Sequence, residues 1–434
     1  MAGVIGVVSN KECFEDLYFG LHYLQHRAQD FCGVGWLDGK KLESKTHRGL
    51  VEKGFSLEAL RELKSNLFIG SVAGDRQPVS ELSQVGGMLL SYDGNIINYE
   101  ELTNSFLKEG ETFSNYSNLG DVKDTAVVSK IISREVNFVK GVERLVEVVQ
   151  GDFAIVGLTR EGVYATRGWG RKPLILGKKD GTYAVSSESN SFENTGLEIV
   201  RDVKPGEIVL LNQEGIHSKR ELDLSPIKYG TFEWIYTAYP PSVIDGKSVS
   251  EVRKSVGRAL AEKYPVEADI VSPIPNSGRW HAVGYSQESG LRYEEVFVRY
   301  DYSGRSFTRG EQAARDLEAR TKLIPVRGSI EGKRIIIVDD SIVRATQMLN
   351  RVKELKRLGA KEVHARIACP PLMAACEYGK TTKKDEDCIA RRMPVDRIRE
   401  LLGLDSLEYA TADMLEKSIG LPRDKLCLAC WGEH

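Results

Sequence analysis

The chain has 434 residues, of which 41% are hydrophobic and 28% are charged. This length favours two or three domains, and the composition excludes a fibrous or disordered protein. The formal net charge of -2 and the interspersed basic residues argue against nucleic acid or an anionic membrane as a partner. The sequence contains no membrane-spanning apolar run and no signal-peptide pattern, so we expect a cytoplasmic protein.

The first half of the chain contains short apolar runs separated by turns. These runs predict strands at residues 4–8, 86–91, 153–158, 182–187 and 207–211, and helical spacing predicts helices at 15–26 and 124–135. We therefore expect two antiparallel sheets with helices. His22 and His26 lie four apart on the first helix and are interpreted as surface and packing residues, because no acidic or Cys partner is near in sequence.

A junction between two domains is predicted near residues 226–229, which gives domains at 1–225 and 226–434. Just after it, Trp234 and Tyr236 are two apart, the spacing of same-face residues in a strand.

The second half contains a strand, loop, helix and strand in succession. Residues 335–338 form a continuous β-branched run, helical spacing follows at 347–358, and a strand resumes at 363–368. This order places Asp339 and Asp340 at the carboxyl edge of a parallel sheet, where open α/β sheets bind ligands. Carboxylates there can accept hydrogen bonds from ribose hydroxyls, although a strand followed by two Asp residues can also be a surface cap.

The loop after these carboxylates is suited to a phosphate. Its backbone N–H groups and the start of the following helix can bind an anion, and hydroxyl and guanidinium groups would add donors. The loop residues are Ser341, Ile342, Val343, Arg344, Ala345 and Thr346.

The string Val338-Asp-Asp-Ser-Ile-Val-Arg344 resembles the phosphoribosyl-pyrophosphate (PRPP) loop of type I phosphoribosyltransferases, in the version of the glutamine PRPP amidotransferase family. The resemblance implies that Asp339, Asp340 and the loop bind PRPP together with Mg²⁺. Ala345 departs from the family, which usually has Gly there, and its β-carbon would crowd a backbone that approaches phosphate closely.

Two further segments extend this resemblance. Residues 269–278 resemble the pyrophosphate-binding loop, with Asn276 in place of an acid before Ser277 and Gly278. Residues 302–307 and 320–323 resemble the flexible catalytic loop and its shoulder, which implies catalytic roles for Tyr302, Arg305 and Lys322. Taken alone, the second segment could be a solvated loop with scattered charge.

The N-terminal half is similar to the class II glutaminase domain of the same family, through Leu17-Tyr-Phe-Gly-Leu21, Leu24-Gln-His-Arg27, Asp93-Gly-Asn-Ile-Ile-Asn98 and residues 201–209. The resemblance then covers nearly the whole chain. It implies an α+β, αββα N-terminal-nucleophile domain at 1–225, followed by an α/β type I phosphoribosyltransferase domain with a Cys-containing extension at 226–434.

Several glutaminase positions depart from the family. Ala2 stands where the nucleophilic Cys is expected, Ala73 where an Arg clamps the glutamine carboxylate, and Asp93-Gly94 where Asn-Gly supplies the oxyanion donor. Only Asp124, expected to hold the substrate amine, is retained. The sequence therefore predicts an inactive glutaminase, whether Ala2 is natural or engineered. In a family segment that contributes to an inter-domain contact, Tyr239 and Pro241 also replace Arg and Asp.

Seven scattered Cys residues argue against a disulfide framework. By resemblance, Cys376, Cys427 and Cys430 match ligands of a [4Fe–4S] cluster found in one branch of the family, while the fourth ligand is absent from its usual place. Cys388 or Cys369 could substitute, and the alternative is a set of residual buried thiols.

These expectations lead to a transferase that adds ammonia to PRPP and releases pyrophosphate, forming 5-phosphoribosylamine for purine biosynthesis. Two alternatives stay open: a transferase with another nucleophile, and a non-catalytic regulator that binds PRPP or nucleotides. The resemblance also implies a homo-oligomer and purine nucleotide effectors.

Overall fold

The computed structural model describes residues 1–83, 86–113, 122–300, 322–379, 382 and 384–433. The chain divides into two compact units. Unit 1 comprises Met1–Gly230, Thr237–Ser248 and Glu377–Thr381, and unit 2 comprises Thr231–Tyr236, Val249–Cys376 and Thr382–His434. No helix among the described residues is long and apolar enough to cross a membrane.

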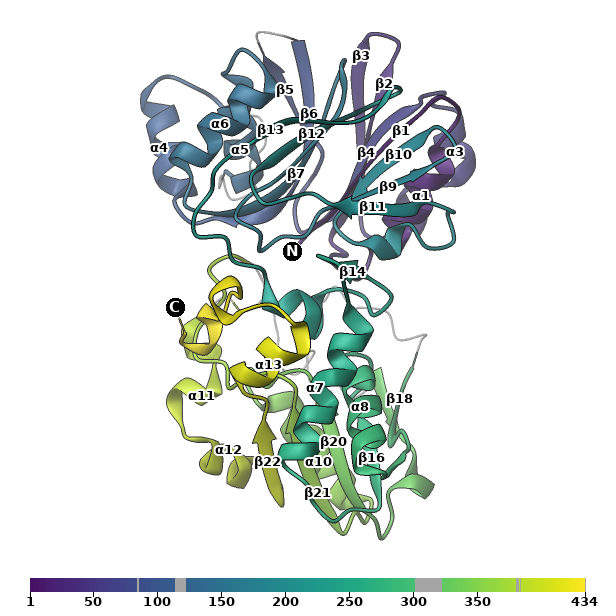
Figure 1. Ribbon diagram of the computed structural model, residues 1–434, viewed down its shortest axis with the longest axis vertical. Coiled ribbons are helices and arrows are strands. Elements are labelled where there is room, and N and C mark those ends of the chain that lie inside the picture. Colours follow the sequence, from purple (N-terminus) through teal and green to yellow (C-terminus); the bar gives the residue numbers. More distant parts are fainter. Residues whose placement is uncertain (84–85, 114–121, 301–321, 380–381, 383, 434) are drawn as a thin grey trace. The chain divides into compact units, whose positions relative to one another are not determined.

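Two antiparallel sheets form the centre of unit 1 within the described residues (Figure 1). The seven-stranded sheet has the order β11 (Glu198–Asp202), β9 (Ile175–Lys179), β10 (Thr182–Ser186), β1 (Gly3–Ser9), β4 (Leu67–Ala73), β2 (Phe31–Asp38) and β3 (Lys41–Arg48). The six-stranded sheet has the order β13 (Gly215–Glu221), β12 (Glu207–Asn212), β8 (Gly162–Arg167), β7 (Gly151–Thr159), β6 (Gly86–Ile96) and β5 (Val79–Ser83).

Alternating apolar residues of both sheets make a shared core between them, with Val4, Ile69, Leu89 and Val156 among its fully buried members. Each sheet also buries its other face against helices, as residues of period two require. The helices are α1 (Phe14–Tyr23), α2 (Val51–Gly54) and α3 (Leu57–Arg61) on the seven-stranded sheet, and α4 (Tyr99–Lys108), α5 (Asp124–Ser133) and α6 (Phe138–Val148) on the six-stranded sheet. The predicted αββα layering is therefore confirmed.

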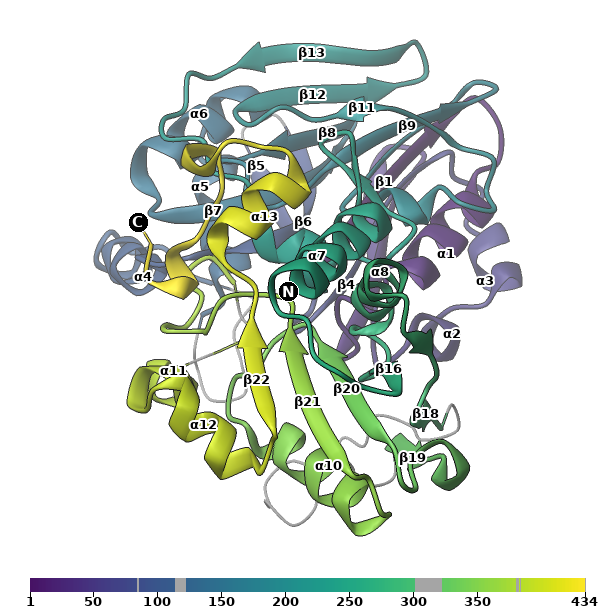
Figure 2. The same ribbon diagram turned by 60° about the horizontal axis from the view of Figure 1, so that its bottom comes forward.

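Unit 2 is built on a parallel sheet (Figure 2). Its order is β17 (Arg292–Tyr293), β16 (Ile270–Pro273), β20 (Arg334–Asp339), β21 (Glu362–Ile367) and β22 (Ser406–Tyr409). All four residues from Ile335 to Val338 are fully buried, as predicted for a central parallel strand. A separate ribbon pairs β18 (Phe297–Arg299) with β19 (Leu323–Pro325).

Helices accompany this sheet, as expected for an α/β domain. Helix α7 (Val249–Lys263) packs against α8 (Arg279–Ser289) and α13 (Ala412–Ile419), while α10 (Thr346–Arg357) packs with β21 and α12 (Val395–Leu402). The short helix α11 (Ile389–Arg392) precedes α12.

The prediction that Trp234 and Tyr236 lie on the same face of a strand is wrong. Glu233–Thr237 form a π-helix, in which Trp234 is buried and Tyr236 is exposed. Residues two apart do not share a helical face, so the short aromatic pattern gave the wrong period.

Candidate functional sites

The two carboxylates predicted to bind ribose lie at the end of β20. The Asp340 N–H donates to Asp339 Oδ1 at 2.9 Å, and the Ser341 hydroxyl donates to Asp340 Oδ2 at 2.5 Å. Asp340 is buried and Asp339 is partly exposed. Burial, followed by the negative charge of Asp340, raises the pKa of Asp339 well above its usual value. Two adjacent carboxylates are chemically suited to the hard cation Mg²⁺.

The loop after these carboxylates requires a left-handed residue at Ala345. This residue has φ 64° and ψ -16° and precedes α10 directly. An L-residue in this conformation is strained by about 1–2 kcal/mol relative to the right-handed region, whereas Gly adopts it freely. The departure from the family's Gly therefore falls on a position where Gly has a physical advantage.

The candidate pyrophosphate loop emerges beside this loop. β16 pairs in parallel with β20, so that Pro273 lies opposite Val338. Gly278 packs directly on β20, because an added β-carbon would meet the Val338 carbonyl oxygen at 2.2 Å. Asn276 is exposed, and Ser277 forms a hydrogen bond with Asp339. Asn276, Ser277 and Gly278 are thus brought to the same sheet edge as the carboxylates.

The remaining transferase residues are only partly described. Tyr302 and Arg305 lie outside the described residues. Lys322 immediately precedes β19, and its carbonyl oxygen accepts a hydrogen bond from the Tyr300 N–H at 2.9 Å. Arg344 donates to Asp387 Oδ2 at 2.6 Å, so its guanidinium is paired with an acid of unit 2.

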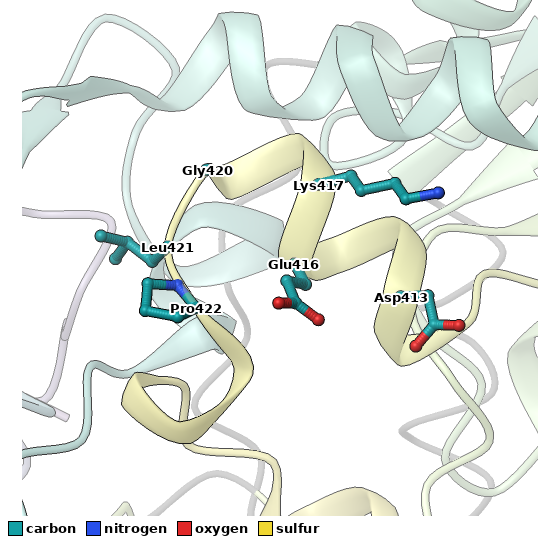
Figure 3. Close-up of a pocket in the computed structure, with 6 residues that line it drawn as sticks. All are labelled: Asp413, Glu416, Lys417, Gly420, Leu421 and Pro422. Atoms are coloured by element: carbon teal, nitrogen blue, oxygen red, sulfur yellow. The ribbon is translucent and has the colours of Figure 1, made fainter.

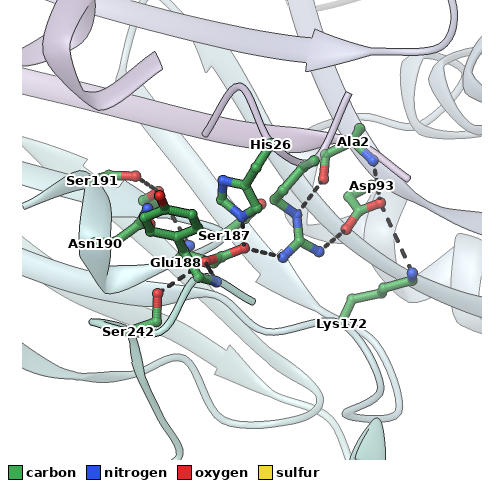
Figure 4. Close-up of polar contacts among 12 residues, drawn as sticks. Ala2, His26, Asp93, Lys172, Ser187, Glu188, Asn190, Ser191 and Ser242 are labelled. Carbon is green, nitrogen blue, oxygen red and sulfur yellow. Dashed lines mark hydrogen bonds and ion pairs between the residues drawn. The ribbon is translucent and has the colours of Figure 1, made fainter. Parts of the chain in front are cut away.

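The candidate glutaminase centre is a buried network of ion pairs (Figure 4). The Ala2 N–H donates to Asp93 Oδ1 at 2.8 Å, and Arg27 donates from Nε to the Ala2 carbonyl oxygen at 2.8 Å. Arg27 also donates from one terminal nitrogen to Asp93 Oδ2 at 3.0 Å and from the other to Glu188 Oε1 at 2.6 Å. Lys172 Nζ lies 4.0 Å from Asp93 Oδ1.

These cations keep Asp93 ionised although it is almost completely buried. Burial by itself raises the pKa of Asp93, but the charges of Lys172 and Arg27, with the hydrogen bond from Ala2, lower it to about 2. A permanent carboxylate at this position would repel a developing oxyanion instead of stabilising it. The apolar residues Ala2 and Ala73 offer neither a nucleophile nor a guanidinium, and both are buried.

Asp124, which the sequence predicts to hold the substrate amine, already has partners within the protein. Its Oδ2 accepts a hydrogen bond from the Tyr92 hydroxyl at 3.1 Å, and its Oδ1 accepts one from the Thr125 N–H at 3.1 Å. Tyr92 lies across Gly94, whose added β-carbon would meet the Tyr92 hydroxyl at 2.7 Å. The phenol therefore fills space beside the residue that was expected to hold the substrate amine.

Sequence reasoning missed the residues that organise this centre, namely Arg27, Tyr92, Lys172 and Glu188. Glu188 lies 161 positions from Arg27, and no periodic pattern links residues so far apart. His26 was interpreted as a packing residue, but its Nε2 lies 2.8 Å from Glu188 Oε1. The segment Leu24-Gln-His-Arg27, noted only for its resemblance, was the available signal.

The candidate cluster cysteines lie in unit 2. Burial first, and then the neighbouring thiol groups of Cys376, Cys427 and Cys388, raise the pKa of Cys430. Within the described part of the chain, however, no group of three or more His, Cys, Asp or Glu side chains is arranged to hold a metal ion. Cys369, one of the two candidate substitutes for the fourth ligand, is fully buried.

A surface pocket near the end of α13 shares no lining residue with either candidate site (Figure 3). It is lined by Asp413, Glu416, Lys417, Gly420, Leu421 and Pro422. Arg423 pairs with Asp413, and its N–H donates to Glu416, so these acids are engaged within the protein.

The two units have the architecture of a class II glutaminase domain and a type I phosphoribosyltransferase domain. A family model described as a glutamine amidotransferase domain matches residues 64–194. The amidophosphoribosyltransferase of Methanothermobacter thermautotrophicus is 35% identical over 445 residues, which cover 99% of this chain and 93% of that protein. The amidophosphoribosyltransferase of Bacillus subtilis is 35% identical over 446 residues, which cover 99% and 92%.

The solved structure of the B. subtilis glutamine PRPP amidotransferase, complexed with ADP and GMP, matches with a TM-score of 0.90 at 33% identity. The match covers 99% of this chain and 96% of that one. The chain therefore belongs to the amidophosphoribosyltransferase family.

Proposed function

We propose that the protein binds Mg-PRPP in unit 2 and transfers the phosphoribosyl group to ammonia. The observation that carries this proposal is the convergence of Asp339 and Asp340 with the loop at 276–278, on adjacent parallel strands. The carboxylates after β20 suit ribose hydroxyls, and the loop at 276–278 suits pyrophosphate. A single substrate would therefore contact both. Membership in the amidophosphoribosyltransferase family supports the same substrate.

The reaction breaks the bond between ribose C1 and the pyrophosphate oxygen and forms a bond between C1 and nitrogen. Ammonia loses one proton, and the products are 5-phosphoribosylamine and pyrophosphate. Asp339 and Asp340 orient the ribose, and the backbone N–H groups of residues 341–346 bind its 5-phosphate. Mg²⁺ bound with the substrate would neutralise charge on the departing pyrophosphate. We assign Tyr302, Arg305 and Lys322 to closure over the substrate.

We further propose that the glutaminase activity is lost. Ala2 provides no nucleophile, and the ionised Asp93 occupies the position of the oxyanion donor. Asp124 accepts a hydrogen bond from Tyr92, so a glutamine amine would have to share this carboxylate with the phenol in the described conformation. Free glutamine should therefore give no glutamate above background, and turnover of glutamine would overturn this part of the proposal.

Pyrophosphate release from Mg-PRPP tests the whole proposal. The purified protein is assayed with ammonia, with glutamine and without a nitrogen donor, at several pH values. We expect release with ammonia alone. Release with none of these donors would favour the second candidate, a regulatory homologue, or a transferase with another acceptor, which the changes at Asn276 and Ala345 would permit.

Other properties of the family are carried over as proposals. We propose purine nucleotides as effectors, because the B. subtilis structure contains ADP and GMP. A homo-oligomer and a cytoplasmic location are proposed from the family and from the composition. For the thiols, iron and sulfide analysis of anaerobically purified protein distinguishes a [4Fe–4S] cluster from residual buried thiols, and no catalytic step depends on the answer.

A further inference from the structure

The segment Thr237–Ser248, here called the linking segment, belongs to unit 1 and leads in sequence into α7 of unit 2. Side chains of unit 1 hold it at two places. Near its start, Glu188 Oε2 accepts hydrogen bonds from the Tyr239 N–H at 2.7 Å and the Ser242 hydroxyl at 2.9 Å. Near its end, the Asp245 N–H donates to Asp202 at 2.9 Å, and Arg167 pairs with the Asp245 carboxylate.

Glu188 can hold the start of the segment only while its own charge is compensated, because it is fully buried. Its second oxygen, Oε1, is contacted by Arg27 at 2.6 Å and by His26 at 2.8 Å. Burial by itself raises the pKa of Glu188, but the contacts with His26 and then Arg27, together with the Tyr239 N–H, lower it to about 2. The carboxylate therefore joins the linking segment to Arg27.

Arg27 is in turn oriented by the candidate glutaminase centre. Its side chain is fully buried and lies between two carboxylates, those of Asp93 and Glu188. The planar guanidinium contacts Asp93, Glu188 and the Ala2 carbonyl oxygen at the same time. Without the charge of Asp93, Arg27 would lose one of its two buried anions, and the orientation that meets Glu188 would be less strongly favoured.

We propose that Asp93 is a positioning residue that acts through Arg27 and Glu188 to hold the start of the linking segment on unit 1. The former catalytic centre thereby serves as an anchor for the segment that leads to α7. This role goes beyond the proposed transferase and does not depend on it. The competing explanation is that Glu188, with His26 and Arg27, holds the segment equally well without the charge of Asp93.

Hydrogen exchange of the full-length protein tests the anchor in the absence of substrates, so failure of the transferase would not affect the result. In Asp93→Asn, which preserves the size of the side chain, the amides of Tyr239 and Ser242 should exchange about tenfold faster than in the wild type. The amide of Asp245 should keep its rate, because Asp202 and Arg167 hold it separately.

Asp124→Asn is the matched control, since Asp124 is another buried acid of unit 1 that contacts Tyr92 rather than Arg27. It should leave the exchange of Tyr239 and Ser242 unchanged. Unchanged exchange in Asp93→Asn, or equal acceleration in both variants, would overturn the proposal. Should Asp93→Asn fail to fold, Arg27→Lys provides the second test, because Lys keeps the charge but cannot make three directed contacts; wild-type exchange in that variant would also overturn it.

Discussion

The Tyr92 hydroxyl donates a hydrogen bond of 3.1 Å to the Asp124 carboxylate, and both side chains are buried. Burial first, and then the neighbouring Asp124, raise the pKa of Tyr92 well above its usual value, so the phenol stays protonated and keeps donating. Asp124, predicted from the sequence to hold a substrate amine, thus has a hydrogen-bond partner inside the protein.

Removal of this donor should reduce stability. Tyr92→Phe leaves one oxygen of a buried carboxylate without its phenol partner, and we expect a loss of about 1–3 kcal/mol in the free energy of unfolding. Urea titration followed by circular dichroism measures it. Tyr164→Phe is the control, because the Tyr164 hydroxyl donates to Glu161, which is exposed, and its loss should cost less. An equal or smaller loss in Tyr92→Phe would contradict the assignment.

The PRPP site is tested by the double variant Asp339→Asn and Asp340→Asn. Replacement of both carboxylates removes the proposed ribose acceptors and the charge that suits Mg²⁺, so binding of Mg-PRPP should be abolished while the fold is kept. Isothermal titration calorimetry measures the affinity, and circular dichroism checks the fold. Asp396→Asn, at an exposed position on α12, should bind like the wild type. Unchanged affinity in the double variant would refute the placement of the site.

An Ala-to-Gly substitution usually destabilises a protein, but we expect the opposite at the left-handed Ala345. Ala345→Gly should stabilise the protein by about 0.5–1 kcal/mol, because relief of the strained conformation exceeds the entropy gained by the unfolded chain. Ala360→Gly is the control, since Ala360 lacks a positive φ. This substitution should destabilise the protein by about 0.5–1 kcal/mol. Thermal unfolding compares them, and destabilisation by Ala345→Gly would contradict the argument.

The buried ion network predicts a loss of stability in acid. The pKa of Asp93 and that of Glu188 are lowered to about 2 in the folded protein, from ordinary values of 3.8 and 4.5. Depressed values mean that the folded state favours the ionised form, so the contribution is complete above pH 4.5 and is lost as the pH falls toward 2. Thermal midpoints across this range measure it. Glu188→Gln should show a shallower pH dependence than the wild type, and an identical dependence would contradict the prediction.

The sequence was sufficient for the parts of the fold that depend on local patterning. The β-branched run at 335–338 predicted a buried parallel strand because such a strand is apolar on both faces, and β20 confirms it. Asp339 and Asp340 come directly after this run, so the sequence also placed them at the carboxyl end of the strand. Their role as ribose ligands stays a prediction, as do the roles of the other proposed site residues.

For the glutaminase centre, the sequence could predict only which expected residues are replaced. Ala2, Ala73 and Asp93 are visible as departures from a family pattern, but the new partners of Asp93 come from the α1–β2 connection and from a position between β8 and β9. Such contacts depend on the packing of two sheets, which no single-sequence pattern encodes. The π-helix at Glu233–Thr237 was not predicted for a different reason. Two aromatic residues are too few to distinguish a helical period from a strand period.

The path of the chain between the two units has a consequence for dissecting the protein. Unit 1 takes in the linking segment after the chain has already entered unit 2 at Thr231–Tyr236. A fragment that ends at residue 225 would lack Tyr239 and Ser242, leaving the buried Glu188 carboxylate without the two donors that they supply. Such a fragment should therefore be less stable than one that retains both donors. A fragment extended to residue 248 retains these donors and is the shorter piece from which an isolated N-terminal unit should be sought.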